Sequence, residues 1–198
     1  MSAGLILAFL VVSQSGPTGE GFGRGLGFGA MVLVSILVHE LGHAIVGRRM
    51  GLRPLGILLH GFGGLCRYDR APRGLQGALV SVAGPAAGLL LGAIAGVVWL
   101  TQGPVLPDWA AWTVVNLAII NVFWSLFNLL PMLPLDGGHV VFHVLEARWE
   151  LPVVHRIVRW MSLITAVFVG LWALAEGQVF ILIVVALVVM QNLPFSRR

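Results

Sequence analysis

The stretch VHELGHAIVGRR, residues 38–49, ends an apolar run that begins near Leu26. It places two histidines and a glutamate in a segment otherwise suited to a lipid-facing helix, and it closes on Arg48 and Arg49. Ionisable side chains inside a membrane span are costly and are therefore functional candidates. The stretch raises two questions: whether the chain spans a membrane, and what its histidines bind.

The composition is that of an integral membrane protein. Hydrophobic residues make up 58% of the 198 residues, charged residues make up 10%, and the mean hydropathy is +0.95. A membrane helix needs roughly 20 apolar residues. Five runs approach or exceed this length, namely residues 26–47, 75–100, 110–135, 160–175 and 179–193, and a shorter first run is residues 3–12. The sequence thus predicts an all-α polytopic membrane protein with about six transmembrane helices.

The arginines are distributed asymmetrically between the two sides of the predicted membrane. All twelve basic residues are Arg, which is typical of a GC-rich bacterial genome. If every run spans, all of them except Arg24 fall on one side, and the positive-inside rule places that side and both termini in the cytoplasm. The net charge of +4 is then explained by plasma-membrane topology and predicts no nucleic-acid partner.

The connections between the runs differ in character. Residues 14–24 and 101–109 are polar and contain Gly and Pro, which predicts two external loops. Residues 176–178 predict the tightest turn, and residues 136–150 predict an amphipathic cytoplasmic helix that ends before Pro152.

One long connection, residues 51–74, is the least helical part of the chain. It is rich in Gly and Pro, and its apolar residues do not recur at helical spacing. Residues 55–68 predict one or two short strands with a Gly-rich bend. Cys66, the only cysteine, excludes an internal disulfide and a thiolate zinc cluster.

His39, Glu40 and His43 form an HExxH motif on a predicted helix. Residues i and i+4 lie on one helix face about one turn apart, so both imidazoles can bind one ion. Zinc suits imidazole nitrogen, and hydrolytic zinc sites have three protein ligands and one open position for water. Glu40, on the flank of that face, is placed to accept a proton from a water acidified by the metal. The alternative is a pair of buried histidines hydrogen-bonded to neighbouring helices.

A candidate third ligand stands in NVFWSLFNLLPMLPLDGG, residues 121–138. There an apolar helix is broken by Pro131 and Pro134 and ends on Asp136, on the same side as the end of the HExxH helix. The topology thus brings Asp136 to the depth of the two histidines. A role as N-cap of the following helix is the alternative, and it is compatible with ligation.

Charge and backbone freedom support the same position. One zinc ion, one Asp ligand and an ionised Glu40 sum to zero charge, which a low-dielectric site tolerates. Gly137 and Gly138 would let the backbone turn sharply beside the metal.

Together these motifs resemble the site-2 protease family of intramembrane zinc metalloproteases. HELGH in one span, AGP (residues 83–85) in the next and FNLLPMLPLDGG in a third follow the family order. The resemblance implies that His39, His43 and Asp136 bind one zinc ion and that Glu40 is the catalytic base. It places the chain with minimal members that lack PDZ and CBS domains.

The resemblance also implies substrate-binding residues. Asn128, eight residues before the aspartate, would help to hold the substrate or the oxyanion. Residues 51–74 would form a membrane-embedded β-hairpin, with Gly61 and Gly63 matching the family's GxG element. Gly88 departs from the pattern, since many members carry Asn there, and this puts a polar role at position 88 in doubt.

The predicted organisation is a single membrane-embedded metalloprotease domain, residues 1–198. Its catalytic core is residues 26–143, which include the hairpin region 51–74, and residues 155–194 form a C-terminal helix pair. The length leaves no room for an appended PDZ-sized or CBS-sized module.

The predicted activity is hydrolysis of a peptide bond within or near the transmembrane segment of a single-span protein, as in regulated intramembrane proteolysis. An unwound substrate helix exposes backbone groups that need partners in lipid. An edge strand at residues 57–65 could pair with them by β-augmentation. The predicted partners are this substrate and the bilayer, and the sequence is compatible with an oligomer or a separate regulatory partner.

Three alternatives remain open at this point. His139 and His143 also stand at i and i+4 but lack an adjacent Glu, which favours a surface or supporting role, with His139 beside Asp136, over a second metal site. Glu146 is the alternative third ligand. A non-catalytic metal-binding protein or transporter would use the same ligands, but an intact Glu40 beside them favours hydrolysis.

Overall fold

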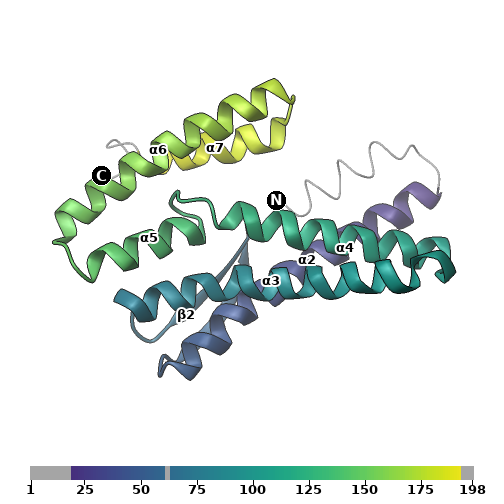
Figure 1. The fold of residues 1–198 in the computed structure, drawn as a ribbon, viewed down its shortest axis with the longest axis horizontal. Helices are drawn as coiled ribbons and strands as arrows, with labels where there is room; N and C mark the ends of the chain where they lie inside the picture. Colours follow the sequence, from purple (N-terminus) through teal and green to yellow (C-terminus); the bar gives the residue numbers. More distant parts are fainter. Residues whose placement is uncertain (1–18, 61–62, 193–198) are drawn as a thin grey trace. The chain divides into compact units, whose positions relative to one another are not determined.

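A computed structural model describes residues 19–60 and 63–192 of this protein. That part of the chain contains helices α2 to α7, a short 3-10 turn and one β-hairpin (Figure 1). Four helical segments within it are long and apolar enough to cross a membrane: Gly23–Arg49, Gly74–Val105, Asp108–Asn128 and Leu151–Ala175. The protein is therefore a mostly helical, multi-pass membrane protein. The helix predicted at residues 3–12 lies outside the described residues.

The contacts divide the chain into two compact units. The first comprises Met1–Arg70 and Ala83–Leu126, and the second comprises Ala71–Val82 and Phe127–Arg198.

Helix α2, Gly19–Arg49, carries the HExxH motif. The prediction of an external loop up to Arg24 was wrong for residues 19–24, which are helical. A glycine costs roughly 1 kcal/mol relative to Ala in a helix. In lipid, however, a helix satisfies all of its backbone polar groups internally, which favours helix even for a Gly-rich segment.

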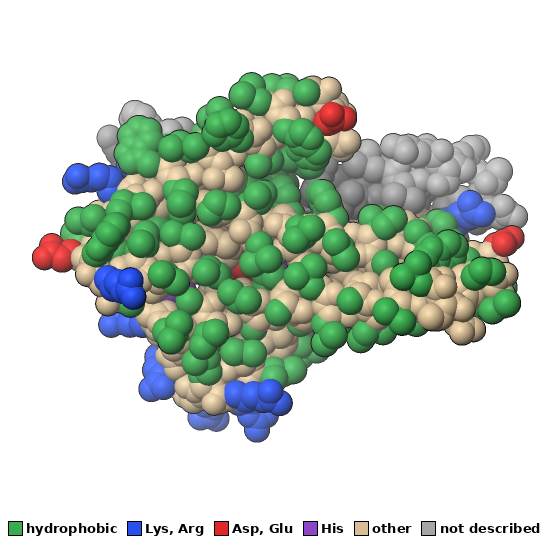
Figure 2. Space-filling view, in the orientation of Figure 1, with side chains coloured by type: hydrophobic (Ala, Val, Ile, Leu, Met, Phe, Trp, Pro, Cys, Tyr) green, Lys and Arg blue, Asp and Glu red, His purple; other side chains and the backbone are tan. Residues whose placement is uncertain are grey.

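Helix α2 has polar side chains on its buried face and apolar side chains on its exposed face, the reverse of an amphipathic helix in a soluble protein. Its buried face carries Ser35, His39 and His43 at four-residue intervals, with Glu40 beside them. Its exposed face carries large apolar side chains, namely Leu33, Val34, Leu37, Leu41 and Ile45. On the face of the molecule shown in Figure 2, hydrophobic side chains are likewise spread over the surface of the helices. Polar groups turned inward and apolar groups turned outward are what a lipid surrounding selects.

Strands β1, Pro54–His60, and β2, Gly63–Tyr68, form a two-stranded antiparallel hairpin. Leu58 pairs with Leu65, and the register shifts between Pro54 and Gly56. The strands predicted within residues 55–68 are thereby confirmed. Strand β2 packs on α2, where the ring of Tyr68 fills the space beside Gly47: a Cβ at position 47 would lie 2.5 Å from Tyr68 Cε1.

Two further helices are α3, Gly74–Gln102, and α4, Asp108–Asn128. Their residues from Ala83 to Leu126 complete the first unit. The prediction of an external loop at residues 101–109 was too long, because α3 continues through Gln102 and a 3-10 turn at Gly103–Val105 leads almost directly to α4. Helices α2 and α3 approach closely where Gly42 faces the carbonyl oxygen of Ala83. Small residues at such contacts are typical of membrane helix pairs.

The second unit contains α5, Asp136–Glu146, and the antiparallel pair α6, Leu151–Ala175, and α7, Val179–Asn192 (Figure 1). The turn predicted at residues 176–178 is confirmed, with Gly177 at a φ of +66°. The core of this unit is Met132, Ala166, Ala173, Ile181, Val185 and Val188.

Three predicted helix ends in this region were wrong. The span expected at residues 110–135 ends at Asn128, because Pro131 cannot donate a helical hydrogen bond and disfavours helix in the residue before it. The helix expected at residues 136–150 ends at Glu146. The span expected at residues 160–175 begins nine residues earlier, at Leu151, because Pro152 is tolerated in a first helical turn.

Candidate metal centre

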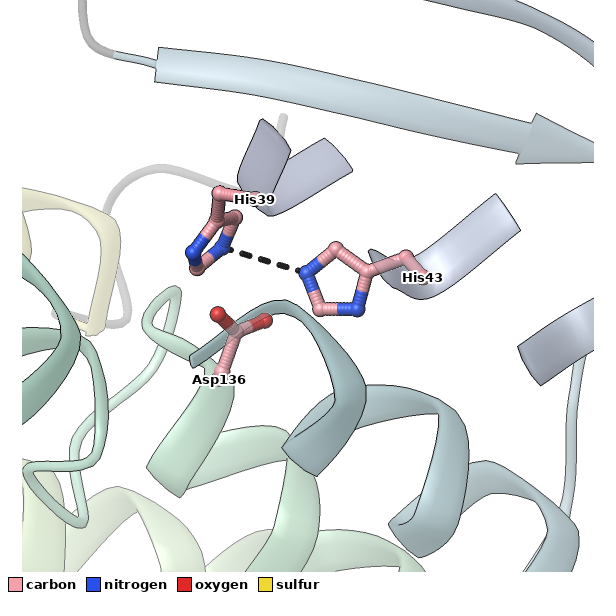
Figure 3. A group of neighbouring side chains, drawn as sticks. All are labelled: His39, His43 and Asp136. Carbon is pink, nitrogen blue, oxygen red and sulfur yellow. Dashed lines mark hydrogen bonds between the residues drawn. The ribbon is translucent and has the colours of Figure 1, made fainter. Parts of the chain in front are cut away.

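His39 and His43 stand one turn apart on the buried face of α2, and both are more than 90% buried. Their Nε2 atoms are 3.2 Å apart, within hydrogen-bond distance (Figure 3). The rings meet edge to face, with centroids 4.8 Å apart and planes inclined by 80°. The helical spacing of the motif has thus brought two imidazole nitrogens to one point.

The separation of these nitrogens fits a shared zinc ion. Zinc binds His nitrogen at about 2.0–2.1 Å with tetrahedral geometry, which requires two ligand nitrogens roughly 3.3–3.4 Å apart. The observed 3.2 Å is close to that value. Only a small movement of either ring would be needed to bind the ion.

Gly84 of α3 keeps open the space in front of both histidines. A Cβ at this position would lie 2.7 Å from His39 Nε2 and closer still to His43 Nε2. The AGP motif therefore has a steric function in this chain, which sequence reasoning noted only as a pattern. The sequence signal for this function is a glycine in the span that packs against the HExxH helix.

Glu40 is 4% exposed and lies under strand β2. A Cβ added at Gly64 would lie 2.5 Å from Glu40 Oε1 and would also meet the carbons of that side chain. Gly64 is therefore the hairpin glycine that touches the candidate base, and the sequence analysis missed it. Of the two glycines that were predicted, Gly63 begins β2 and Gly61 lies outside the described residues.

Gly88 faces a polar atom from the neighbouring helix. Ser125 of α4 is fully buried, and its Oγ lies where a side chain at position 88 would begin. This hydroxyl has no hydrogen-bond partner among the described residues. Many family members have Asn at this position, whereas this chain has Gly88. The polar atom near position 88 is here supplied by Ser125 of α4.

Asp136 belongs to the second unit, where it is the first residue of α5 (Figure 3). The N-cap of α5 is Leu135, without a side-chain hydrogen bond, so the alternative of Asp136 as an ordinary N-cap was wrong. Acidic residues in a first turn are favoured by the helix dipole.

Gly137 and Gly138 do not form the sharp turn that was predicted. Both are helical, and neither has a positive φ. Each would clash, if it carried a Cβ, with backbone atoms of the connection before α5: Gly137 with Leu129 and Leu130, Gly138 with Met132 and Leu133. The two glycines therefore serve close backbone packing that holds the start of α5.

Asn128 is the last residue of α4 and is 9% exposed. It and Asp136 flank the connection formed by residues 129–135, in which the Leu133–Pro134 peptide bond is cis. The backbone N–H of Leu133 donates to Ser162 Oγ of α6 at 2.9 Å. A buried hydroxyl on α6, which the sequence did not single out, thus anchors the segment between the two candidate residues.

Glu146, considered above as the alternative third metal ligand, makes hydrogen bonds to α3 and α5. Its Oε1 accepts a hydrogen bond from the Gly74 backbone N–H at 2.7 Å and pairs with His143 Nδ1 at 2.6 Å. Burial raises the pKa of the Glu146 carboxyl, but these hydrogen bonds and the charges of His143 and Arg73 outweigh it, so the pKa lies below its usual value. The carboxylate joins α5 to the start of α3.

His139 and His143 are neighbours on α5, but the geometry does not favour a second metal site there. Their rings are stacked, with centroids 6.4 Å apart and planes inclined by 27°. The ring of His143 lies against Gly77, where a Cβ would overlap it. His143 therefore packs α5 on the start of α3, and the role of His139 beside Asp136 stays a prediction.

Comparisons with known proteins agree with this geometry. The sequence matches Peptidase family M50 over residues 27–109 and 93–172. The chain belongs to this family. The M50 match includes the HExxH helix, the hairpin, Asp136 and most of α6.

Among the relatives of this M50 chain, Rip3 of Mycobacterium tuberculosis is 34% identical over 168 residues, which cover 82% of the chain and 38% of Rip3. Zinc metalloprotease MJ0392 of Methanocaldococcus jannaschii is 29% identical over 126 residues, 60% of the chain and 34% of the relative. The chain thus spans little more than a third of the length of these relatives.

A solved structure has the same fold. The site-2 protease from Methanocaldococcus jannaschii superposes with a TM-score of 0.70 over 96% of this chain and 86% of that one, at 21% identity. The expected site-2 protease fold is thereby confirmed.

Proposed function

We propose that this protein is an intramembrane zinc metalloprotease that hydrolyses a peptide bond within or near the transmembrane segment of a single-span membrane protein. One observation carries the proposal. Two buried imidazole nitrogens lie 3.2 Å apart, beside a buried glutamate, on the interior face of a membrane helix. Membership of family M50 supports a peptidase over a metal transporter.

The proposed zinc ligands are His39, His43 and Asp136. Among the described residues, these three form the set of His, Cys, Asp and Glu side chains suited to share one ion. Two neutral imidazoles and one carboxylate, with an ionised Glu40, balance the charge of Zn²⁺, which lowers the cost of a buried site. When bound, zinc would polarise the scissile carbonyl and acidify the attacking water.

The remaining steps belong to the side chains of the protein. Glu40 accepts the proton of the attacking water and delivers it to the leaving amine. The Asn128 amide, at the end of α4, donates a hydrogen bond to the developing oxyanion. Burial of Glu40 excludes bulk water, so the proton is kept for the leaving group.

The hairpin is proposed to hold the substrate. A transmembrane helix must unwind locally before cleavage, and its freed N–H and C=O groups then need partners. Within the described residues each strand of the hairpin pairs only with the other, so an outer edge is open for β-augmentation. Gly63, the first residue of β2, would allow close backbone approach, and the same role is proposed for Gly61.

The orientation that we propose places both termini and the Arg-rich connections in the cytoplasm. Arg48 and Arg49 are exposed at the end of α2, about one turn beyond His43. By the positive-inside rule this end of α2 lies on the cytoplasmic side of a bacterial plasma membrane. Water reaches the site from that side. A membrane-tethered regulator cleaved in regulated intramembrane proteolysis is the proposed kind of substrate.

The direct test is cleavage of single-span reporter peptides by the purified protein in detergent. Cleavage should occur within or near the transmembrane segment, stop when a chelator removes the metal, and resume when zinc is added back. Tight zinc binding without cleavage of any peptide in a broad panel would instead favour the metal-binding or transport alternative.

Replacing Asp136 with Ala tests the third ligand. Loss of one of three protein ligands should weaken zinc binding at least about tenfold, because even outer-shell partners of metal ligands contribute 10–100-fold. The measurement is zinc affinity by competition with a chelator. Glu146→Ala is the matched comparison, since Glu146 is the rival carboxylate. If Glu146→Ala lost zinc and Asp136→Ala retained it, the ligand assignment would be wrong.

Replacing Gly64 with Ala tests the contact between the hairpin and the base. The added Cβ must displace either strand β2 or the Glu40 carboxylate, so cleavage should fall at least about tenfold, as expected when a catalytic base is misplaced. Zinc content should be unchanged, because the atoms nearest to a Cβ at Gly64 all belong to Glu40. Gly56→Ala on β1, where a Cβ meets nothing within 4 Å, is the control and should remain active.

A further inference from the structure

We propose that Asn121 is a positioning residue for the zinc site. It would act by holding the helix of the two histidines in register with the helix that leads to Asp136. The inference rests on the zinc site proposed above and adds a residue outside the motifs that define that site.

Asn121 joins α4 to α2 through a buried hydrogen bond. Its Nδ2 donates to Ser35 Oγ at 2.9 Å and to its own helix at Leu117 O at 2.8 Å. Ser35 uses its hydroxyl hydrogen for Met31 O at 2.8 Å. Asn121 and Ser35 are 2% and 3% exposed. Both donors of the amide and the only donor of the hydroxyl are therefore engaged in one continuous network.

The network lies one turn from a candidate ligand on α2 and two turns from a candidate substrate-binding residue on α4. Ser35 precedes His39 by one turn on the same buried face of α2. Along α4, Asn121 is followed two turns later by Asn128, and residues 129–135 then lead to Asp136. The Ser35–Asn121 bond thus connects the helix with two proposed ligands to the helix that precedes the third.

The glycine contacts between α2 and α3 are steric. Gly42 packs on Ala83 and Ala87, and Gly84 packs on the two imidazoles. Such contacts fix how closely α2 approaches α3, but smooth surfaces of small residues do not by themselves fix rotation or sliding. A hydrogen bond depends steeply on distance and angle, so it adds the register that steric contacts do not supply.

Asn116 provides a matched control on the same helix. It is the same residue type, and its Nδ2 donates to Trp112 O at 2.7 Å, within α4. Asn116→Ala therefore removes the local helical bond, whereas Asn121→Ala removes a local bond and the bond to α2. The difference between the two variants isolates the contact between the helices.

The experiment is zinc affinity of the full chain in detergent, measured by chelator competition. Asn121→Ala should raise the Kd about tenfold, and Asn116→Ala should leave it within about twofold. Ser35→Ala should act like Asn121→Ala, and the double variant should be no worse than either single variant, because coupled residues are not additive. With cobalt in place of zinc, the visible spectrum should change in Asn121→Ala, since it reports the ligand geometry.

Two results would overturn the proposal. If Asn121→Ala lowered the melting temperature but left the zinc Kd and the cobalt spectrum unchanged, the bond would serve stability alone. Fully additive effects of Ser35→Ala and Asn121→Ala would show that they do not act through their mutual bond. Should Asn121→Ala not fold, Ser35→Ala with Asn116→Ala makes the same comparison. No arm uses a substrate, so absence of proteolysis would overturn the protease proposal and not this one.

Discussion

Replacing Glu40 with Gln is expected to reduce cleavage of a single-span reporter by about 10²–10⁴-fold, the usual contribution of a general base. The amide has nearly the size of the carboxylate, so the packing of strand β2 at Gly64 should be kept. It cannot accept the proton of the attacking water. Zinc should remain bound, because His39 and His43 are unchanged.

The measurement combines cleavage rate and metal content of the same preparation. Glu176→Gln, at the exposed end of α6, is the control for a Glu-to-Gln change far from the site. A rate in Glu40→Gln close to that of the unmodified protein would show that Glu40 is not the base. Loss of zinc in this variant would show that its carboxylate supports the metal instead.

The parts of the site that follow from chain geometry could be predicted from the sequence. Helical periodicity fixes the i and i+4 relation of His39 and His43, and the structure has their Nε2 atoms 3.2 Å apart. The Gly and Pro content of residues 51–74 and the lack of helical spacing among their apolar residues predicted the strands of the hairpin, which pair as β1 and β2. Both relations are local, so the pattern of nearby residues contains them.

The helix ends were predicted less well, because the sequence signals for loops are calibrated on chains in water. Gly19 to Arg24 contain turn-forming glycines, but the segment is helical. In lipid an unsatisfied backbone group costs several kcal/mol, which exceeds the propensity loss of about 1 kcal/mol per glycine. The span expected at residues 110–135 ends at Asn128, before Pro131, which lacks a backbone donor.

Contacts between distant segments were the part that the sequence could not supply. Gly64 and Gly84 face Glu40 and the histidines only because β2 and α3 pack on α2. Gly137 and Gly138 were interpreted as a turn from the general freedom of glycine, whereas they allow backbone contacts inside one unit. A glycine in a pattern shows that space is needed, and the fold shows what fills it.

Gly84→Ala is expected to weaken zinc binding by more than about 100-fold, beyond the 10–100-fold typical of residues that only support a ligand. The new Cβ would lie less than 3 Å from Nε2 of both His39 and His43, the atoms proposed to bind zinc. Movement of α2 away from α3 would break the close packing of Gly42 on Ala83. Either the helices separate or the rings rotate, and both proposed histidine ligands are disturbed at once.

Metal content and cleavage should fall together in Gly84→Ala, whereas Gly64→Ala should lose cleavage alone. Gly96→Ala is the matched control on α3, since a Cβ there meets nothing within 4 Å. It should keep both zinc and activity and show that an extra methyl group in this helix is tolerated. If Gly84→Ala bound zinc as tightly as Gly96→Ala, the two Nε2 atoms would not be the metal ligands. The contrast between Gly64 and Gly84 thus separates the base from the ligands without changing either.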